Sequence, residues 1–138
     1  MPAGEYEKEN IGDGDLEVLI LEVGPNQETT PENHYSCLEA EPGHYKCVAE
    51  DEDWMVITMD MDPGEEDKPH SHREHVVYIL SEGELSIWGG DKKTDPEKPD
   101  VGPVPVKPGV VLPVPTGYHI VKNSGDSKHV SAMFFERK

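Results

Sequence analysis

The sequence contains only two cysteines, Cys37 and Cys47, among 138 residues. Small secreted domains that cannot build a large core are usually held by several disulfides, so this count excludes a disulfide scaffold. Basic residues are also scarce, because 12 lysines and arginines stand against 29 acidic residues, for a formal net charge of −17. Nucleic acids and anionic membrane surfaces both attract a basic footprint, so we expect neither as a partner. The acidic excess indicates a solvated surface.

Long apolar runs and helical periodicity are missing as well. No stretch approaches the ~20 apolar residues that span a bilayer. Residues 1–15 lack the basic and apolar regions of a signal peptide, so we expect a cytoplasmic protein with free thiols. No window shows a convincing 3.6-residue apolar period, which predicts little helix. The 13 prolines and 13 glycines separate short apolar runs, a pattern typical of a single all-β domain.

Alternating apolar residues define the predicted strands. Met55, Ile57 and Met59 share one face of a strand, and Val77 and Ile79 share one face of another. We interpret both sets as candidate walls of an internal pocket, with ordinary core packing as the alternative. The predicted strands, with a loop over residues 89–103, are Leu16–Val23, Cys37–Ala40, Tyr45–Ala49, Trp54–Met61, His75–Leu80, Glu84–Trp88, Val104–Val106, Val110–Val114, His119–Val121 and Val130–Phe135.

Three histidines occupy positions suited to metal binding. His70 and His72 lie on one face of a strand, since alternate residues point the same way, and two such imidazoles can chelate one ion. An isolated pair of this kind is more often solvated surface. His119 follows a Pro-x-Gly turn early in another strand and can close the site from the opposite wall. Imidazole ligands suit a divalent transition metal, and we keep Fe, Mn, Ni, Zn and Cu open.

Two segments that carry these histidines resemble the motifs of the cupin superfamily. Residues 64–83 (GEEDKPHSHREHVVYILSEG) resemble G-x5-H-x-H-x3-4-E-x6-G, and residues 109–123 (GVVLPVPTGYHIVKN) resemble G-x5-P-x-G-x2-H-x3-N. The second is one residue short before His119, although its His-x3-Asn spacing is kept. The resemblance implies an all-β cupin double-stranded β-helix, a jelly-roll barrel, with His70, His72 and His119 as metal ligands.

The same resemblance sets the expected domain organisation and assembly. We expect the barrel over residues 51–138 and a partly ordered N-terminal extension over residues 1–50. Small cupins often pair through their sheet edges, which protects exposed strand hydrogen bonds. A homodimer is therefore the expected assembly.

The glutamate of the first motif has no counterpart here, which leaves two registers open. Counting back from Gly83 places Val76 in its position, whereas aligning the Val-Val-Tyr-Ile-Leu strand places His75 there. We prefer His75, because a length change is easier in a turn than in a paired strand, where one slip reverses every side chain. Glu74 is a weaker candidate, and a solvated rim position is the alternative for His75. The expected metal ligands are His70, His72, His75 and His119.

The resemblance leaves two classes of function open. An all-histidine site donates no charge, so a bound divalent ion remains a strong Lewis acid toward an anionic chelating substrate. Among cupins, such sites occur in dioxygenases of thiols and diketones. We expect a metal-dependent enzyme acting on a small molecule, with dioxygenase-like chemistry leading and isomerase or lyase chemistry competing. The alternative is a non-catalytic module that binds or senses a small ligand. Tyr118 is a weak candidate for a catalytic residue.

A repeat with a ten-residue offset lies outside these motifs. His34 and Cys37 recur as His44 and Cys47, a donor set that suits structural zinc. Fewer residues separate the two halves than zinc sites usually allow, so we favour two paired strands with coincidental similarity. His129, on the last predicted strand, is expected to be structural or exposed.

Overall fold

The computed structural model describes residues 7–22, 24, 25, 30–112, 114 and 116–138. Nine strands and one helix form in this part: α1 (Cys37–Ala40), β1 (Tyr45–Glu50), β2 (Trp54–Met61), β3 (His70–His72), β4 (His75–Ile79), β5 (Gly83–Gly89), β6 (Val101–Val106), β7 (Val111–Leu112), β8 (Gly117–Asn123) and β9 (Val130–Arg137).

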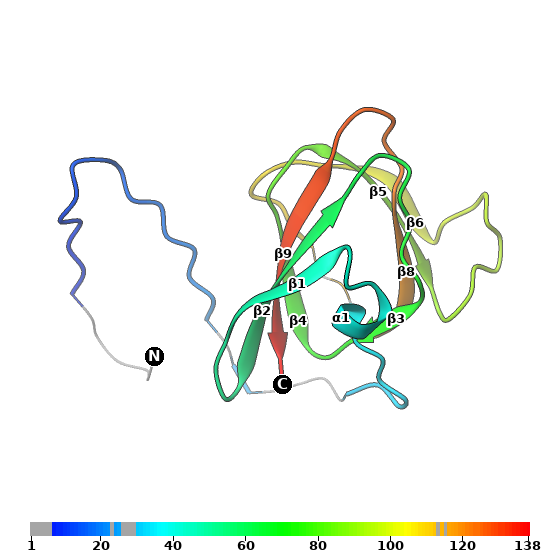
Figure 1. Cartoon of the computed structure of the whole chain (residues 1–138), viewed down its shortest axis with the longest axis horizontal. Helices are drawn as coiled ribbons and strands as arrows, with labels where there is room; N and C mark the ends of the chain where they lie inside the picture. Colours follow the sequence, from blue (N-terminus) through cyan, green and yellow to red (C-terminus); the bar gives the residue numbers. More distant parts are fainter. Residues whose placement is uncertain (1–6, 23, 26–29, 113, 115) are drawn as a thin grey trace.

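The strands form two antiparallel sheets that face each other across one apolar core (Figure 1). One sheet has the order β1-β2-β9-β4-β7 and the other the order β3-β8-β5-β6. With only one short helix described, the predicted all-β class is confirmed. No helix in the described residues is long and apolar enough to cross a bilayer.

The core consists of the alternate residues of strands that line the barrel interior. Ile57, Met59, Val77 and Ile79 are buried, as the period-2 pattern predicts, whereas Met55 is only partly buried. Met59 and Val77 border an internal void of about 20 Å³. Most of these candidate pocket walls are therefore ordinary core.

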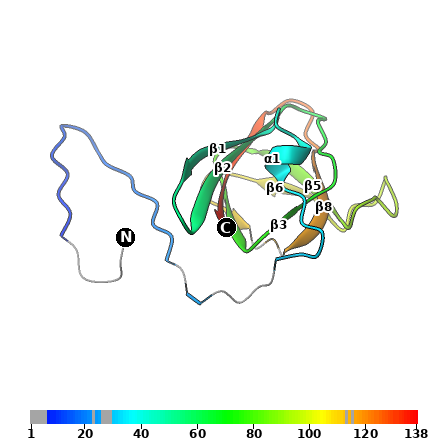
Figure 2. The same cartoon turned by 60° about the horizontal axis from the view of Figure 1, so that its bottom comes forward.

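Helix α1 occupies Cys37–Ala40, so the strand predicted there is wrong. Ser36 caps the helix, because its side chain accepts a hydrogen bond from the Leu38 N–H at 3.2 Å. One helical turn then places Cys37 and Ala40 on the same buried side. The helix packs at one end of the barrel, near β1 and β3 (Figure 2). The repeat is thus not a pair of strands.

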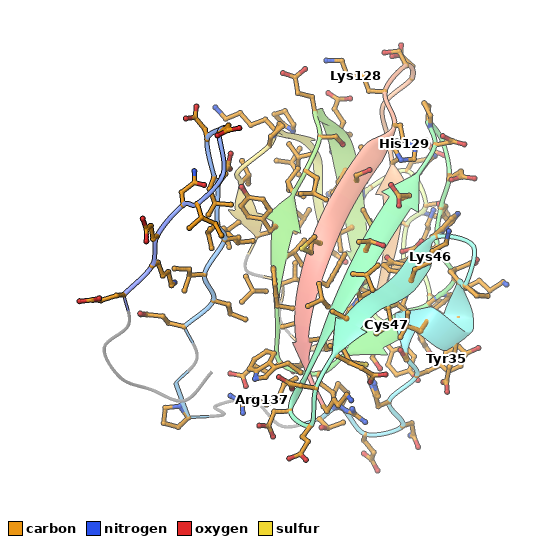
Figure 3. The ribbon with its side chains drawn as sticks, turned by 60° about the vertical axis from the view of Figure 1, so that its left-hand side comes forward. Tyr35, Lys46, Cys47, Lys128, His129 and Arg137 are labelled. Atoms are coloured by element: carbon orange, nitrogen blue, oxygen red, sulfur yellow. The ribbon has the colours of Figure 1, made fainter. Side chains whose placement is uncertain are left out.

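The strand predicted at Leu16–Val23 is wrong over its described residues, 16–22, which form an extended arm beside the barrel (Figures 1 and 3). Leu16, Val18, Leu19 and Ile20 expose between 49% and 66% of their surface. High β propensity produces a strand only where a neighbouring strand pairs with it. The domain boundary at residue 50 stays a prediction; β1, which precedes it, pairs with β2.

Two strands in the C-terminal half, β6 and β7, have bounds that differ from the predicted ones. β6 begins at Val101, inside the predicted loop, and includes Pro103 and Pro105. Proline is tolerated there because β6 is the edge of its sheet and needs fewer backbone donors. β7 comprises Val111–Leu112 only, and Pro113 of the longer predicted strand lies outside the described residues.

Candidate metal centre

Three of the four predicted ligands lie together on β3 and β8. His70 and His119 are directly opposite in this antiparallel pair, and His72 lies two residues further along β3 on the same face. The ring centroids are 4.7 Å apart for His70–His119 and 5.0 Å for each of the other two pairs. All three side chains are buried. One ligand nitrogen from each lies within 4.8 Å of the other two.

Hydrogen bonds at Nδ1 fix the orientation of two of these rings. Nδ1 of His70 lies 2.9 Å from the Lys68 carbonyl oxygen, and Nδ1 of His72 lies 2.7 Å from Oε2 of Glu136. Both partners are acceptors, so Nδ1 carries the proton and Nε2 keeps its lone pair. Neither Nε2 has a hydrogen-bond partner in the described part of the chain, although both atoms are buried. A cation bound by these lone pairs would satisfy them, so the donor set fits a metal.

Burial and neighbouring rings favour the neutral form of two imidazoles in the cluster, those of His72 and His119. Burial lowers the pKa of His72 well below its ordinary value of 6.5, and the adjacent rings of His75 and His70 lower it further. Burial likewise lowers the pKa of His119 well below 6.5, with His72 adding to the effect. Only the neutral form binds a metal, so ligands of this kind are available without displacing a proton at neutral pH.

His75 lies next to the cluster but outside the group of three. It shares the buried face of β4 with Val77, while Val76 lies on the other face. Its ring stacks on His72, with centroids 4.4 Å apart and an interplanar angle of 30°, and its Nδ1 lies 2.7 Å from the Arg73 carbonyl oxygen. Ligation by His75 therefore stays a prediction.

A cavity of about 440 Å³ opens beside His119. Its wall includes His119 but neither His70 nor His72, so a small molecule would approach the cluster from the His119 side. A separate hollow of about 490 Å³, near Lys107 and Lys128, contains none of the histidines. The aliphatic wall of the cavity beside His119, to which β5, β6 and β7 contribute, comprises Leu85, Ile87, Val101, Val104, Leu112 and Val114.

No family model matches the sequence, and no curated protein matches it. Among solved structures, a cupin domain from Bordetella pertussis Tohama I has a TM-score of 0.52 at 24% identity, over 68% of this chain and 91% of that chain. The protein has the cupin fold. An RmlC-like cupin with a double-stranded β-helix fold from Methanocaldococcus jannaschii has a TM-score of 0.49 at 16% identity, over 67% of this chain and 77% of its own. The two sheets and the likeness to the Bordetella pertussis structure confirm the predicted fold class, and fold by itself assigns no activity.

The structure has a buried carboxylate behind His72 that no motif pointed to. Glu136 is 1% exposed, and its Oε1 accepts a hydrogen bond from the Arg73 N–H at 3.2 Å while Oε2 faces His72. Burial raises the pKa of Glu136, although the Arg73 N–H opposes the change. Glu136 follows Phe134 on the buried face of β9, one residue beyond the predicted strand Val130–Phe135, so continuing its alternation would have found it.

A second buried carboxylate, that of Asp67, lies 3.9 Å from Nδ1 of His70 and is held by two residues from the N-terminal part of the chain. Asp67 accepts hydrogen bonds from the Tyr45 hydroxyl at 2.6 Å and from Nδ1 of His44 at 2.9 Å. The edge of the Tyr45 ring contacts the His70 ring, with centroids 5.3 Å apart. Burial raises the pKa of Asp67, and the Tyr45 hydrogen bond opposes that rise. No sequence pattern linked residues 44 and 45 to this position.

The four residues of the repeat do not converge on one point of the structure. His34 lies 2.8 Å from Oγ of Ser71, and the Tyr35 backbone both donates to that oxygen and accepts from the Ser71 N–H. Cys37 is buried, which raises the pKa of its thiol, whereas Cys47 is exposed on β1 (Figure 3). Within the described residues, no group of clustered metal donors contains more than one of the four.

The remaining candidates have defined partners away from the cluster. Tyr118 lines the cavity, and its hydroxyl donates a hydrogen bond to the Asn33 carbonyl oxygen. Glu74, the weaker candidate for a ligand, accepts a hydrogen bond from Nε of Arg137 at 2.8 Å. Glu74 is half-buried, and the structure does not bring it to the histidines.

His129 lies just before β9, at the opposite end of that strand from Arg137 (Figure 3). Its two ring nitrogens each lie 3.0 Å from a carboxylate oxygen, one of Asp60 and one of Asp62. These hydrogen bonds, that to Asp60 first, raise the pKa of His129. His129 is thus an exposed residue in a surface ion-pair group.

Proposed function

We propose that this protein binds one divalent transition metal through His70, His72 and His119 and acts with it on a small molecule from the adjacent cavity. The observation that carries the proposal is the pair of buried Nε2 atoms of His70 and His72 that no described residue satisfies. Unpaired buried polar atoms are uncommon in native proteins and call for an explanation such as an ion. Dioxygenase-like chemistry is the leading reaction class.

A metal at this site would supply Lewis acidity, since three neutral ligands leave its charge undiminished. The chain's own residues have separate tasks. Glu136 and the Lys68 carbonyl hold the tautomers and ring orientations of His72 and His70. The aliphatic wall of the cavity keeps water away from a bound ligand, which strengthens polar interactions at its head group.

A non-catalytic ligand-binding module is the second candidate, and a specific observation favours it. Two polar side chains of the cavity are already committed within the chain: Tyr118 donates to Asn33, and Asp100 accepts from the Gly89 N–H at 2.7 Å. A general acid or base needs a proton-transfer path to the substrate. To donate a proton, Tyr118 would have to give up its Asn33 partner, and Asp100 has only its second carboxylate oxygen left to accept one.

Metal binding can be tested by calorimetric titration of protein prepared without chelators, together with elemental analysis. We expect one tightly bound ion per chain. His70→Ala and His119→Ala should each weaken binding by more than the ~10–100-fold typical of lost supporting contacts. His129→Ala is the matched control, because it removes an exposed imidazole with two carboxylate partners. Unchanged affinity in either ligand variant would overturn the proposed site.

Turnover can be tested with an oxygen electrode. Protein loaded with Fe²⁺ should consume dissolved oxygen in the presence of a small β-diketone such as pentane-2,4-dione, and protein loaded with Zn²⁺ should not. Bound iron and bound diketone without oxygen uptake would reject the dioxygenase-like reaction for this substrate class and favour the binding module.

A further inference from the structure

The cavity beside His119 is poor in positive charge. No lysine or arginine lines it among the described residues. Asp100 contributes a carboxylate to the lining, and the protein as a whole carries a formal charge of −17. An anionic group deep in this cavity, away from the metal, would lose its hydration without gaining an ion pair. Phosphates and second carboxylates are therefore disfavoured.

The cavity is also poor in partners for hydroxyl groups. Its six aliphatic side chains neither donate nor accept hydrogen bonds. Its polar side chains are few: the Tyr118 hydroxyl donates to the Asn33 carbonyl, Oδ2 of Asp100 accepts from the Gly89 N–H, and Thr116 adds one hydroxyl to the wall. Every hydroxyl of a buried sugar needs a partner, because an unpaired one costs its full desolvation free energy. A polyol would leave most of its hydroxyls unpaired here.

We infer that the ligand has one oxygen-chelating head group and an uncharged hydrocarbon body, either a short alkyl chain or a single aromatic ring. The head group would meet the metal on the His119 side, so this inference rests on the proposed metal site. The volume of about 440 Å³ falls within the range of small-molecule sites. The chemistry of the wall disfavours sugars, nucleotides and phosphorylated molecules.

Four hydroxamates that share a chelating head but differ in body test this inference. Co²⁺-loaded protein would be titrated with acetohydroxamate, hexanohydroxamate, succinomonohydroxamate and gluconohydroxamate, with the visible absorption of Co²⁺ as the readout. Each buried methylene raises affinity about fourfold, so hexanohydroxamate should bind at least ~10-fold more tightly than acetohydroxamate. The succinyl and glucono compounds should bind no more tightly than acetohydroxamate. Equal affinity of the first two, or a preference for the polyol, would overturn the inference.

A charge introduced into the wall should change the preference. Val101 lines the cavity and is 50% exposed, so Val101→Lys can be accommodated. This variant should bind succinomonohydroxamate more tightly and hexanohydroxamate more weakly, with little change for acetohydroxamate. Val48→Lys, at a 56% exposed position on β1 outside the cavity, is the matched control. Leu112→Ala should weaken hexanohydroxamate alone, and equal weakening of all four compounds would contradict a body-binding role.

Metal-free protein separates failure of this inference from failure of the metal site. Methyl benzoate should shift the methyl NMR signals of Leu85 and Ile87, and methyl glucoside should not. Such shifts without any Co²⁺ binding would refute the metal site and leave the apolar cavity standing. Co²⁺ binding without a response to any hydroxamate would refute a free coordination position on the metal, and it would also leave the apolar cavity standing. The absence of methyl benzoate shifts, or larger shifts with methyl glucoside, would overturn the inference.

Discussion

Replacing Glu136 by glutamine would remove the buried charge behind His72 and keep the size of the side chain. The amide oxygen can still accept the hydrogen bond from Nδ1 of His72 that the carboxylate oxygen accepts at 2.7 Å. The Arg73 N–H, 3.2 Å from Oε1, would lose its acceptor, because the amide NH₂ group of glutamine would take the place of that oxygen. The substitution therefore tests the charge more than the packing.

The structure predicts opposite effects on metal binding and on the metal-free fold. A carboxylate bonded to a ligating histidine makes that ligand more basic, and its loss typically costs ~10–100-fold in metal affinity, or about 1.4–2.8 kcal/mol. In the metal-free protein, burial raises the pKa of Glu136, so above that pKa the charged form opposes folding. Glu136→Gln at neutral pH should therefore bind metal more weakly and, without metal, be at least as stable as the wild type.

Calorimetric titration with Zn²⁺ measures the first effect, and thermal melting with and without metal measures the second. Glu74→Gln is the matched control, because Glu74 is paired with Arg137 away from the cluster and its loss should leave metal affinity unchanged. Wild-type affinity in Glu136→Gln would refute the supporting role of the carboxylate. A drop of more than ~5 °C in the metal-free Tm, about 1 kcal/mol for a domain of this size, would show that the buried charge stabilises the fold.

Four further predictions follow from the same geometry. His75→Ala should weaken metal binding ~10–100-fold in the same titration, and unchanged affinity would remove His75 from the expected ligands. Val76→Glu should leave metal affinity unchanged, because β4 turns Val76 away from the face of His75; tighter binding would contradict that register. NMR titration should give His129 a pKa above 6.5, and Asp60→Asn should lower that pKa. The stability contributed by this ion pair is therefore present below pH 6.5 and is lost as the pH rises through the raised pKa. An unchanged pKa in the variant would argue against the pair. Leu19→Asp should convert the expected homodimer to a monomer in light scattering, because Leu19 lies on the exposed apolar arm; a dimeric variant would exclude the arm from the interface.

Local periodicity and the two motifs were sufficient for much of the barrel. Trp54–Met61 has the predicted bounds, because its alternation reflects one face against the core and one face outward. The same rule places His70 and His72 on a common face, and the second motif supplies His119 opposite His70. These features depend on side-chain direction within a strand, which the sequence encodes directly.

The features that the sequence did not predict depend on contacts between distant segments. Residues 16–22 have strand composition but no strand partner, and Cys37–Ala40 is helical because Ser36 caps it. The Asp67 network joins residues that are far apart in the chain and that no motif links. Glu136 differs from these, since extending the alternation of the last strand by one more inward position would have placed its charge inside the barrel.

Strand β3 would be stabilised by the ion that its histidines are proposed to bind. It is three residues long and lies at the edge of its sheet, with β8 as its neighbouring strand. An ion held by His70 and His119 would cross-link β3 and β8. It would thereby fix the two ends of the long chain segment that joins these strands. It would also lower the population of molecules in which this edge opens, so amide protons of β3 should exchange with solvent more slowly once metal is added. The strand that carries two of the proposed ligands would then also be the part of the fold that metal binding stabilises most.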